Sequence, residues 1–378
     1  MKFVLEVSEY SYEIHIEGKK IQCVDQTSQQ IIYSKSLRKP IKKVKKERYD
    51  RYKLIHSKKH QYKLIVKPNP KFKSEIITKS SYILDLHLKS PTHGYFFGLY
   101  QIGEFILTKW NKLVLRKTFS IKYCNKGWVT PSNEVYLSLR ESKTLNGPHS
   151  YFFAKLNWKK KPKPSLVWKK QVKSAILSIN QISNLLFLGM KDGSLQRWDI
   201  KNEKWLKGID LFKSPISVLE QKNNKIIATT SSGDIATLQE DGHITWRVKT
   251  GNEQINGVFV DTEGIHVVDY RGMYYQIDST TGKIITQKNW NIDSFPDKST
   301  LSNMIITKNW IIISSGGNFA GYWKDNHAET FRKNSIYQSL VQQLATHPKG
   351  FYSGDDDGRI IFWELPLISI KKEKIKAE

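Results

Sequence analysis

Three consecutive aspartates, Asp355, Asp356 and Asp357, form the densest group of metal-ligand side chains in the sequence. Carboxylate oxygens are the ligands that hard cations such as Ca²⁺ prefer. The run also precedes Gly358, and Asp before Gly is typical of a tight turn, because Asp bonds its own backbone and Gly accepts a positive φ. Asp192 before Gly193 repeats the pattern. We therefore expect turns at both places rather than a metal site.

The other residues that bind metals or perform catalysis are scattered. The ten histidines are His15, His56, His60, His87, His93, His149, His243, His266, His327 and His347, and none of them joins a Cys-x-x-Cys motif. The two cysteines, Cys23 and Cys124, are expected to be buried free thiols. The sequence contains no Gly-x-Ser-x-Gly motif and no glycine-rich phosphate loop. We therefore predict no catalytic residue, metal or cofactor, and expect that the protein is not an enzyme.

Positive charge is concentrated in the first half of the chain. The formal net charge is +26, and residues 1–170 hold 36 of the 61 Lys and Arg but only 12 of the 35 Asp and Glu. A Lys-rich composition that reflects only an A/T-rich genome would extend along the whole chain, so this asymmetry favours an anionic partner. Nucleic acid, an acidic protein and an anionic lipid surface all fit Lys-rich runs interleaved with Tyr and Trp.

Two basic clusters, at residues 35–79 and 155–173, account for most of this charge. From them we predict a partner-binding surface made of Arg38, Lys39, Lys42, Lys43, Lys45, Lys46, Arg48, Arg51, Lys58, Lys59, Lys159, Lys160, Lys161, Lys163, Lys169 and Lys170. Trp158 and Trp168 flank the second cluster.

The basic clusters lie within an internal sequence repeat of about forty residues, so the fold of this repeat determines their positions. A turn residue is followed five positions later by a large apolar residue in the pairs Gly193 and Trp198, Gly233 and Leu238, Gly272 and Ile277, Asn318 and Trp323, and Gly358 and Trp363. Weaker units surround Gly18, His60, Gly103 and Gly147, which gives nine units in all. Many short strands with regular turn signals indicate an all-β architecture.

Four-stranded sheets that recur at this spacing are typical of a β-propeller, because one such sheet cannot bury its faces alone. We predict a single propeller of seven to nine blades over residues 1–366, with basic, divergent blades at 1–173, clearer blades at 174–366 and a Lys-rich tail at 367–378. The run SIYQSLVQQLA fits either a short helix or an innermost strand.

The repeats resemble known propeller families. DDDGRIIFWEL and KDGSLQRWDI resemble WD-repeat units, whereas GMYYQIDSTTGKIITQKNW is similar to the repeat of quinoprotein-type propellers. No unit opens with the Gly-His dipeptide of the WD family, so the buried His-Asp-Ser/Thr-Trp hydrogen-bond network of that family is expected to be absent. The quinoprotein resemblance would imply a dehydrogenase with a quinone cofactor and Ca²⁺, but the sequence lacks a signal peptide and adjacent cysteines.

The sequence favours a non-enzymatic scaffold subunit of a multiprotein complex, in which a basic N-terminal sector docks an acidic partner or nucleic acid. The alternatives are a propeller that itself binds RNA or DNA and, more remotely, a quinoprotein-like dehydrogenase. The N-terminal residues lack an apolar signal-peptide core, and no apolar run is long enough to span a membrane. We therefore expect a cytoplasmic location and find no small-molecule substrate.

Overall fold

The computed structural model describes the chain except for residues 1, 8–9, 18, 26–30, 37–42, 47–50, 58–59, 68–70, 81, 143–147, 160–163, 290–300, 308–309, 324–328, 335–338, 366 and 373–378. Within 2–14, 23–35, 43–72, 301–302, 323–334 and 367–372 the description covers the backbone alone. The described residues form strands in nine sheets. No helix in this part of the chain is long and apolar enough to cross a membrane.

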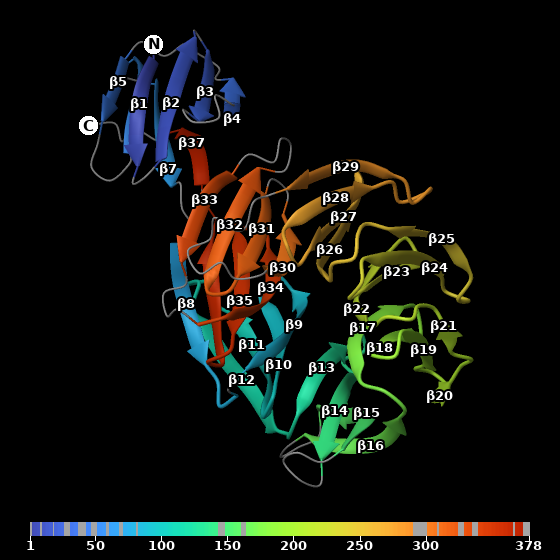
Figure 1. The fold of residues 1–378 in the computed structure, drawn as a ribbon. Coiled ribbons are helices and arrows are strands. Elements are labelled where there is room, and N and C mark those ends of the chain that lie inside the picture. Colours follow the sequence, from blue (N-terminus) through green and yellow to red (C-terminus); the bar gives the residue numbers. More distant parts are fainter. Residues whose placement is uncertain are drawn as a thin grey trace. The chain divides into compact units, whose positions relative to one another are not determined.

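Seven of the nine sheets are the blades of a β-propeller (Figure 1). Blade 1 contains, from the innermost strand outwards, β9 (Ile83–Ser90), β10 (His93–Gly98), β11 (Gln101–Leu107) and β12 (Leu113–Ser120). Blade 2 contains β13 (Cys124–Val129), β14 (Val135–Ser142), β15 (His149–Asn157) and β16 (Ser165–Val172). Blade 3 contains β17 (Ile176–Ile182), β18 (Leu185–Met190), β19 (Ser194–Asp199) and β20 (Lys204–Trp205), and β21 (Ile209–Asp210) also pairs with β19.

The remaining blades follow the same order. Blade 4 contains β22 (Ile216–Lys222), β23 (Lys225–Thr230), β24 (Asp234–Gln239) and β25 (Ile244–Lys249). Blade 5 contains β26 (Ile255–Asp261), β27 (Gly264–Asp269), β28 (Met273–Ile277) and β29 (Ile284–Asn289). Blade 6 contains β30 (Leu301–Ile306), β31 (Trp310–Ser315), β32 (Asn318–Trp323) and β33 (Glu329–Asn334). Blade 7 contains β34 (Val341–His347), β35 (Gly350–Asp355), β36 (Arg359–Glu364) and β8 (Lys71–Ile77). The predicted all-β propeller of four-stranded blades is confirmed, with seven blades.

The innermost strands close into a ring. In order around the axis, β9, β13, β17, β22, β26, β30 and β34 each contact the next, and β34 contacts β9 again. The run SIYQSLVQQLA, which the sequence left open, contains the start of β34 and is therefore an innermost strand where it is described. The ring is the framework that positions the candidate site.

Blade 7 combines strands from distant parts of the sequence. Its outermost strand, β8, precedes blade 1 in the chain and lies beside β36 near the C-terminus. The amide of Thr78 donates a hydrogen bond to the carbonyl of Gly358 at 2.9 Å, just beyond the end of β8. This pairing places a strand that precedes blade 1 in the last blade, so backbone hydrogen bonds link the two ends of the ring.

Two further four-stranded sheets are built from the residues before β8 and after β36. One contains β1 (Lys2–Val7), β2 (Tyr10–Glu17), β3 (Lys20–Asp25) and β4 (Ile31–Ser36). The other contains β37 (Leu367–Lys372), β7 (His60–Lys67), β6 (Arg51–Ser57) and β5 (Lys43–Lys46) in that order. Both belong to a compact unit of residues 1–71, 321–333 and 364–378, whereas residues 72–320 and 334–363 form a second unit.

The repeated turns have the backbone geometry that their sequence favours. Gly193, Gly233, Gly272 and Gly358 all have a positive φ, in the turns between the second and third strands of their blades. In the first of these turns, Oδ1 of Asp192 accepts hydrogen bonds from the amide and hydroxyl of Ser194 at 3.0 and 2.7 Å. The aspartate side chain thus satisfies the backbone of its own turn, as in an Asx turn.

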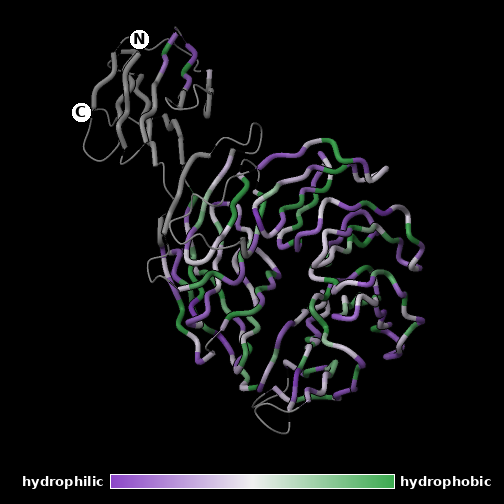
Figure 2. The backbone as a smooth tube through the Cα atoms, in the orientation of Figure 1, coloured by the Kyte–Doolittle hydropathy of each residue, from purple (hydrophilic) through white to green (hydrophobic). Residues whose placement is uncertain are grey.

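The blades pack through aromatic side chains. Trp198 on β19 is fully buried, and its ring centroid lies 5.6 Å from that of Phe153 on β15 in an edge-to-face arrangement. Both belong to a hydrophobic cluster that joins blades 2 and 3. Figure 2 shows that hydrophobic segments recur in the strands of blades 1 to 5. Such packing of neighbouring sheets holds each blade to the next.

Candidate functional site

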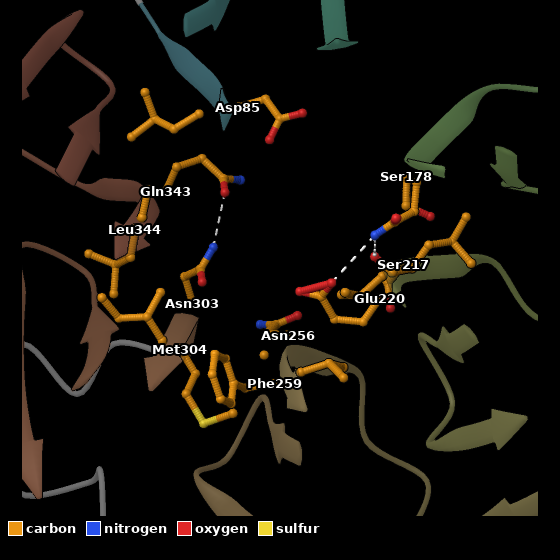
Figure 3. Close-up of a pocket in the computed structure, with 18 of the residues that line it drawn as sticks. Asp85, Ser178, Ser217, Glu220, Asn256, Phe259, Asn303, Met304, Gln343 and Leu344 are labelled. Carbon is orange, nitrogen blue, oxygen red and sulfur yellow. Dashed lines mark hydrogen bonds between the residues drawn. The ribbon is translucent and has the colours of Figure 1, made fainter. Parts of the chain in front are cut away.

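A cavity of about 490 Å³ follows the axis of the ring, and all seven innermost strands line it (Figure 3). We call it the axial channel. Each innermost strand has a register shift after its first paired residue. The seven shifts bring the same register position of every strand to the channel. Two rings of residues result.

The first ring lies at the residue that follows each shift. It contains Asp85, Lys126, Ser178, Val218, Gly257, Asn303 and Gln343. The second ring lies two residues further along each strand, on the same face because side chains alternate. It contains His87, Trp128, Asn180, Glu220, Phe259, Ile305 and Ala345.

The two charged residues of the first ring neutralise each other. Nζ of Lys126 lies 3.6 Å from Oδ1 of Asp85, and it also donates a hydrogen bond to the carbonyl of Leu84 at 3.2 Å. The first ring also contains an amide pair, in which Nδ2 of Asn303 donates to Oε1 of Gln343 at 3.0 Å. These contacts leave no net charge in the first ring.

Glu220 of the second ring stands in a different environment. Its Oε2 accepts hydrogen bonds from the amide of Gln221 at 3.3 Å and from Nδ2 of Asn180 at 3.4 Å. Burial raises the pKa of Glu220 to about 7, and these two donors only partly oppose the shift. In the described part of the chain Glu220 forms no ion pair. Glu220 is therefore a carboxylate that can gain or lose its proton near neutral pH.

The aromatic members of the second ring lie beside neutral groups. His87 and Trp128 make an edge-to-face contact with ring centroids 4.6 Å apart. Burial lowers the pKa of His87, so the imidazole is neutral at pH 7. Nε1 of Trp128 donates a hydrogen bond to Oε1 of Gln181 at 3.0 Å. The second ring therefore offers one ionisable carboxylate beside uncharged aromatic and amide side chains.

A second pocket of about 360 Å³ adjoins the channel, and we call it the rim pocket. Its lining includes Arg140, Tyr151 and Lys191, and it shares Ser217 and Gln254 with the axial channel. These residues lie in blades 2 to 5, where the innermost strands begin and the second strands end. The rim pocket is therefore at one mouth of the channel.

The rim pocket is positively charged. In the described part of the chain neither Arg140 nor Lys191 forms an ion pair. The guanidinium carbon of Arg140 lies 5.7 Å from the ring centroid of Tyr123, whose ring is 5.9 Å from that of Tyr100. A cation–π contact of this kind orients the guanidinium without neutralising its charge. Two cations therefore stay available to an anion.

The predicted basic surface is only partly described. Lys159 is exposed in the turn after β15, Lys169 and Lys170 lie on β16, Lys43, Lys45 and Lys46 lie on β5, and Arg51 lies on β6. The side chains of the last four are not described. Arg38, Lys39, Lys42, Arg48, Lys58, Lys59, Lys160, Lys161 and Lys163 lie outside the described residues.

The two described lysines of β16 have partners within the protein. Nζ of Lys169 pairs with Glu141 at 2.8 Å, and Nζ of Lys170 lies 4.4 Å from the ring centroid of Trp198. Lys155 on the neighbouring strand pairs with Glu134 and Glu203, each at 2.6 Å. These contacts reduce the charge that this part of blade 2 offers to a partner.

Sequence reasoning missed Glu220, Arg140 and Lys191, because each is a single residue outside the basic clusters. The repeat itself holds a signal for the channel, since residues of one ring on successive blades are separated by about one repeat. Asn180 and Glu220, and also Asn303 and Gln343, are forty residues apart. An alignment of the repeats, with the polar residues at each aligned position compared, would have identified the residues that line the channel.

Blade 5 contains one group of possible metal ligands. Oxygen or nitrogen atoms of Asp261, Glu263 and His266 lie within 4.8 Å of one another. Both nitrogens of His266 already have hydrogen-bond partners, Oδ1 of Asp261 at 2.9 Å and the hydroxyl of Tyr274 at 2.7 Å. This arrangement fits a structural hydrogen-bond network that links β26, β27 and β28 of the blade.

Comparison with known proteins supports the fold alone. No family model matches the chain, and no curated protein matches it. Among solved structures, the chain is similar to the computationally designed Ika8 protein, with 14% identity and a TM-score of 0.57, over 78% of this chain and 100% of that one. At this level of identity the similarity shows a shared fold and nothing about function.

Proposed function

We propose that this protein is a non-enzymatic propeller scaffold that docks an acidic segment of a partner protein at the rim pocket. The observation that carries the proposal is the pair of cations without ion-pair partners in the described structure, Arg140 and Lys191, at a pocket of about 360 Å³. A guanidinium can bind a carboxylate through two parallel hydrogen bonds, and an ammonium adds a second charge.

The fold supports a docking role. Loops on rigid blades present a preformed surface, so a partner binds without ordering the scaffold. The aromatic rings of Tyr100, Tyr123 and Tyr151 lie at or beside the rim pocket and supply apolar contact area, which protein interfaces favour. We also propose that the repeats are of the WD type and that the protein is a subunit of a multiprotein complex.

An acidic peptide fits this surface better than nucleic acid does. Nucleic acid binding needs a run of unpaired cations along the phosphate backbone. In the described part of blade 2, Lys155 and Lys169 pair with glutamates of the protein itself. The compact rim pocket therefore suits one or two carboxylates more than a strand of phosphates.

Binding of two labelled probes tests the proposal. Fluorescence anisotropy would compare a fluorescein-labelled oligoglutamate with a single-stranded DNA of matched length, over a salt series. We expect the oligoglutamate to bind more tightly, and R140E/K191E to weaken it by about 10-fold or more, since each charge-assisted contact contributes about 1.5–3 kcal/mol.

The matched control is K201E/K283E, which changes two exposed lysines in the turns between the third and fourth strands of blades 3 and 5. Both double variants alter the net charge equally. Equal weakening by the two variants would mean that only overall charge matters, and tighter DNA binding through the same pocket would favour the nucleic-acid alternative. Either result would overturn the proposal. A melting curve for each variant checks its fold.

A further inference from the structure

We propose that the axial channel binds a small organic ammonium ion, with Glu220 as its counter-ion. The proposal starts from a carboxylate of the axial channel that forms no ion pair with the described residues. In the part of the chain that the structure describes, the hydrogen-bond donors to Glu220 are neutral, namely the Gln221 amide and Nδ2 of Asn180. A carboxylate that is partly shielded from water and lacks a positive partner is costly, and a bound cation relieves that cost.

Among the described residues around Glu220, no protein cation can take this role. The strands that contact β22 across blades or within its own blade are β17, β18, β23 and β26. The side chains that β17 and β26 place in the channel are uncharged, and β18 and β23 place none there. The remaining titratable groups of the channel are His87, which is neutral at pH 7, and Asp85 and Lys126, which pair with each other.

The second ring also explains why the ligand is an organic ion. Phe259 and Trp128 belong to this ring, and Met304 lines the same cavity (Figure 3 labels Glu220, Phe259 and Met304). Aromatic side chains attract organic cations and contact their carbon atoms. A hard metal ion would prefer several oxygen ligands with more than one carboxylate. One carboxylate beside aromatic and amide groups fits an alkylammonium instead.

Hydrogen-bond acceptors for the ammonium protons come from neighbouring strands. Asn256 on β26 and Asn303 on β30 both line the channel and lie around the same space as Glu220 (Figure 3). An ammonium has three donors and no acceptor, so the two carboxylate oxygens of Glu220 and Oδ1 of Asn303 can accept from it, whereas Oδ1 of Asn256 already accepts a hydrogen bond from Nε2 of Gln254 at 2.6 Å. The cavity volume of about 490 Å³ lies within the range of roughly 300–1,000 Å³ that is usual for small-molecule sites.

The overall positive charge of the chain acts only weakly on this site. Exposed lysines are screened by salt beyond a distance of about 8–10 Å, whereas Glu220 lines the channel in which the ligand would bind. The proposal is independent of the rim pocket, because none of the residues that carry it lines that pocket. Failure of oligoglutamate binding would therefore leave the ammonium site untouched.

Calorimetry with phenethylammonium chloride and its neutral analogue 2-phenylethanol tests the inference. At pH 8, where Glu220 is ionised, we expect phenethylammonium to bind wild-type protein at least about 10-fold more tightly than 2-phenylethanol. E220Q should lose most of this preference, because glutamine keeps the shape and removes the charge. E141Q, which changes a glutamate on β14 that pairs with Lys169, is the matched control and should bind like wild type.

Proton release gives a second readout on the wild-type protein alone. A cation beside Glu220 lowers its pKa, so binding near pH 7 must release protons, and the measured heat will depend on the ionisation enthalpy of the buffer. The inference fails if phenethylammonium does not bind at millimolar concentration, if 2-phenylethanol binds equally well, if E220Q binds like wild type, or if no proton is released. Circular dichroism confirms that E220Q is folded.

Discussion

The indole Nε1 of Trp363 donates a hydrogen bond to Oγ of Ser353 at 2.8 Å, between the third and second strands of blade 7. Both side chains are buried. The resemblance to WD repeats would imply a longer network that also contains a histidine and an aspartate. In this blade the hydrogen bond between Ser353 and Trp363 links two neighbouring strands through their side chains.

We expect S353A to lower the free energy of unfolding by about 0.5–1.5 kcal/mol, which is the usual net contribution of one buried hydrogen bond. W363F removes the N–H but also reduces packing. A double-mutant cycle with S353A, W363F and the double variant separates the two effects, and urea unfolding is the measurement. A coupling energy of zero would show that the Ser–Trp link contributes nothing to stability.

The aromatic cluster between blades 2 and 3 predicts a much larger effect. Trp198 is fully buried against Phe153, Trp168 and Trp205. W198A should therefore cost about 3–5 kcal/mol, from lost burial and from the cavity that is left. Trp110 is 79% exposed, and W110A should change stability by less than about 0.5 kcal/mol. Similar losses in thermal or urea unfolding for both variants would contradict the packing role of Trp198.

The turn glycines predict a contrast between two similar substitutions. Gly193 has a φ of +85°, and a Cβ there would lie 2.2 Å from the carbonyl oxygen of Phe212. G193A should therefore destabilise the protein by about 1–3 kcal/mol. At Gly251 the nearest atom to an added Cβ is the Tyr275 hydroxyl at 3.6 Å, which is ordinary contact. G251A should be near neutral, and equal losses for the two variants in urea unfolding would be the contrary result.

The repeat was predictable because residues close together in the sequence specify each unit. An Asp-Gly turn and a large apolar residue five positions later specify a hairpin and its buried face without any information from distant residues. The blade count was not predictable in this way. It depends on β8, whose residues 71–77 pair with β36 almost three hundred residues later, and no local pattern marks that partner. Nine units were counted in the sequence, and the described residues form nine sheets, of which seven are blades.

The candidate site was harder to predict than the fold. The axial channel takes one or two residues from each of seven strands, so no contiguous segment contains it. Glu220 is an ordinary glutamate in the sequence, and only its enclosure by neighbouring blades changes its chemistry. The conspicuous lysines proved less informative, since Lys169 pairs with Glu141 and Lys170 lies against Trp198.

Glu220 also predicts how stability depends on pH. Its pKa rises from 4.5 in the unfolded chain to about 7 in the folded protein, with burial as the main cause. The folded state therefore binds the proton more tightly, so this group contributes full stability below about pH 4.5 and loses it as pH rises through 7. The loss over that window is on the order of 2–3 kcal/mol for the wild-type protein without ligand.

E220Q has no group to titrate at this position, so its free energy of unfolding should fall less than that of wild type between pH 4.5 and 7. The difference between the two curves isolates Glu220, because every other titratable group is shared. Urea unfolding at several pH values in amine-free buffers gives both curves, and agreement between fluorescence and circular dichroism transitions checks that unfolding is two-state. Parallel curves would mean that the Glu220 carboxylate is hydrated as well in the channel as in the unfolded chain, and the enclosure that makes it a counter-ion would then be absent.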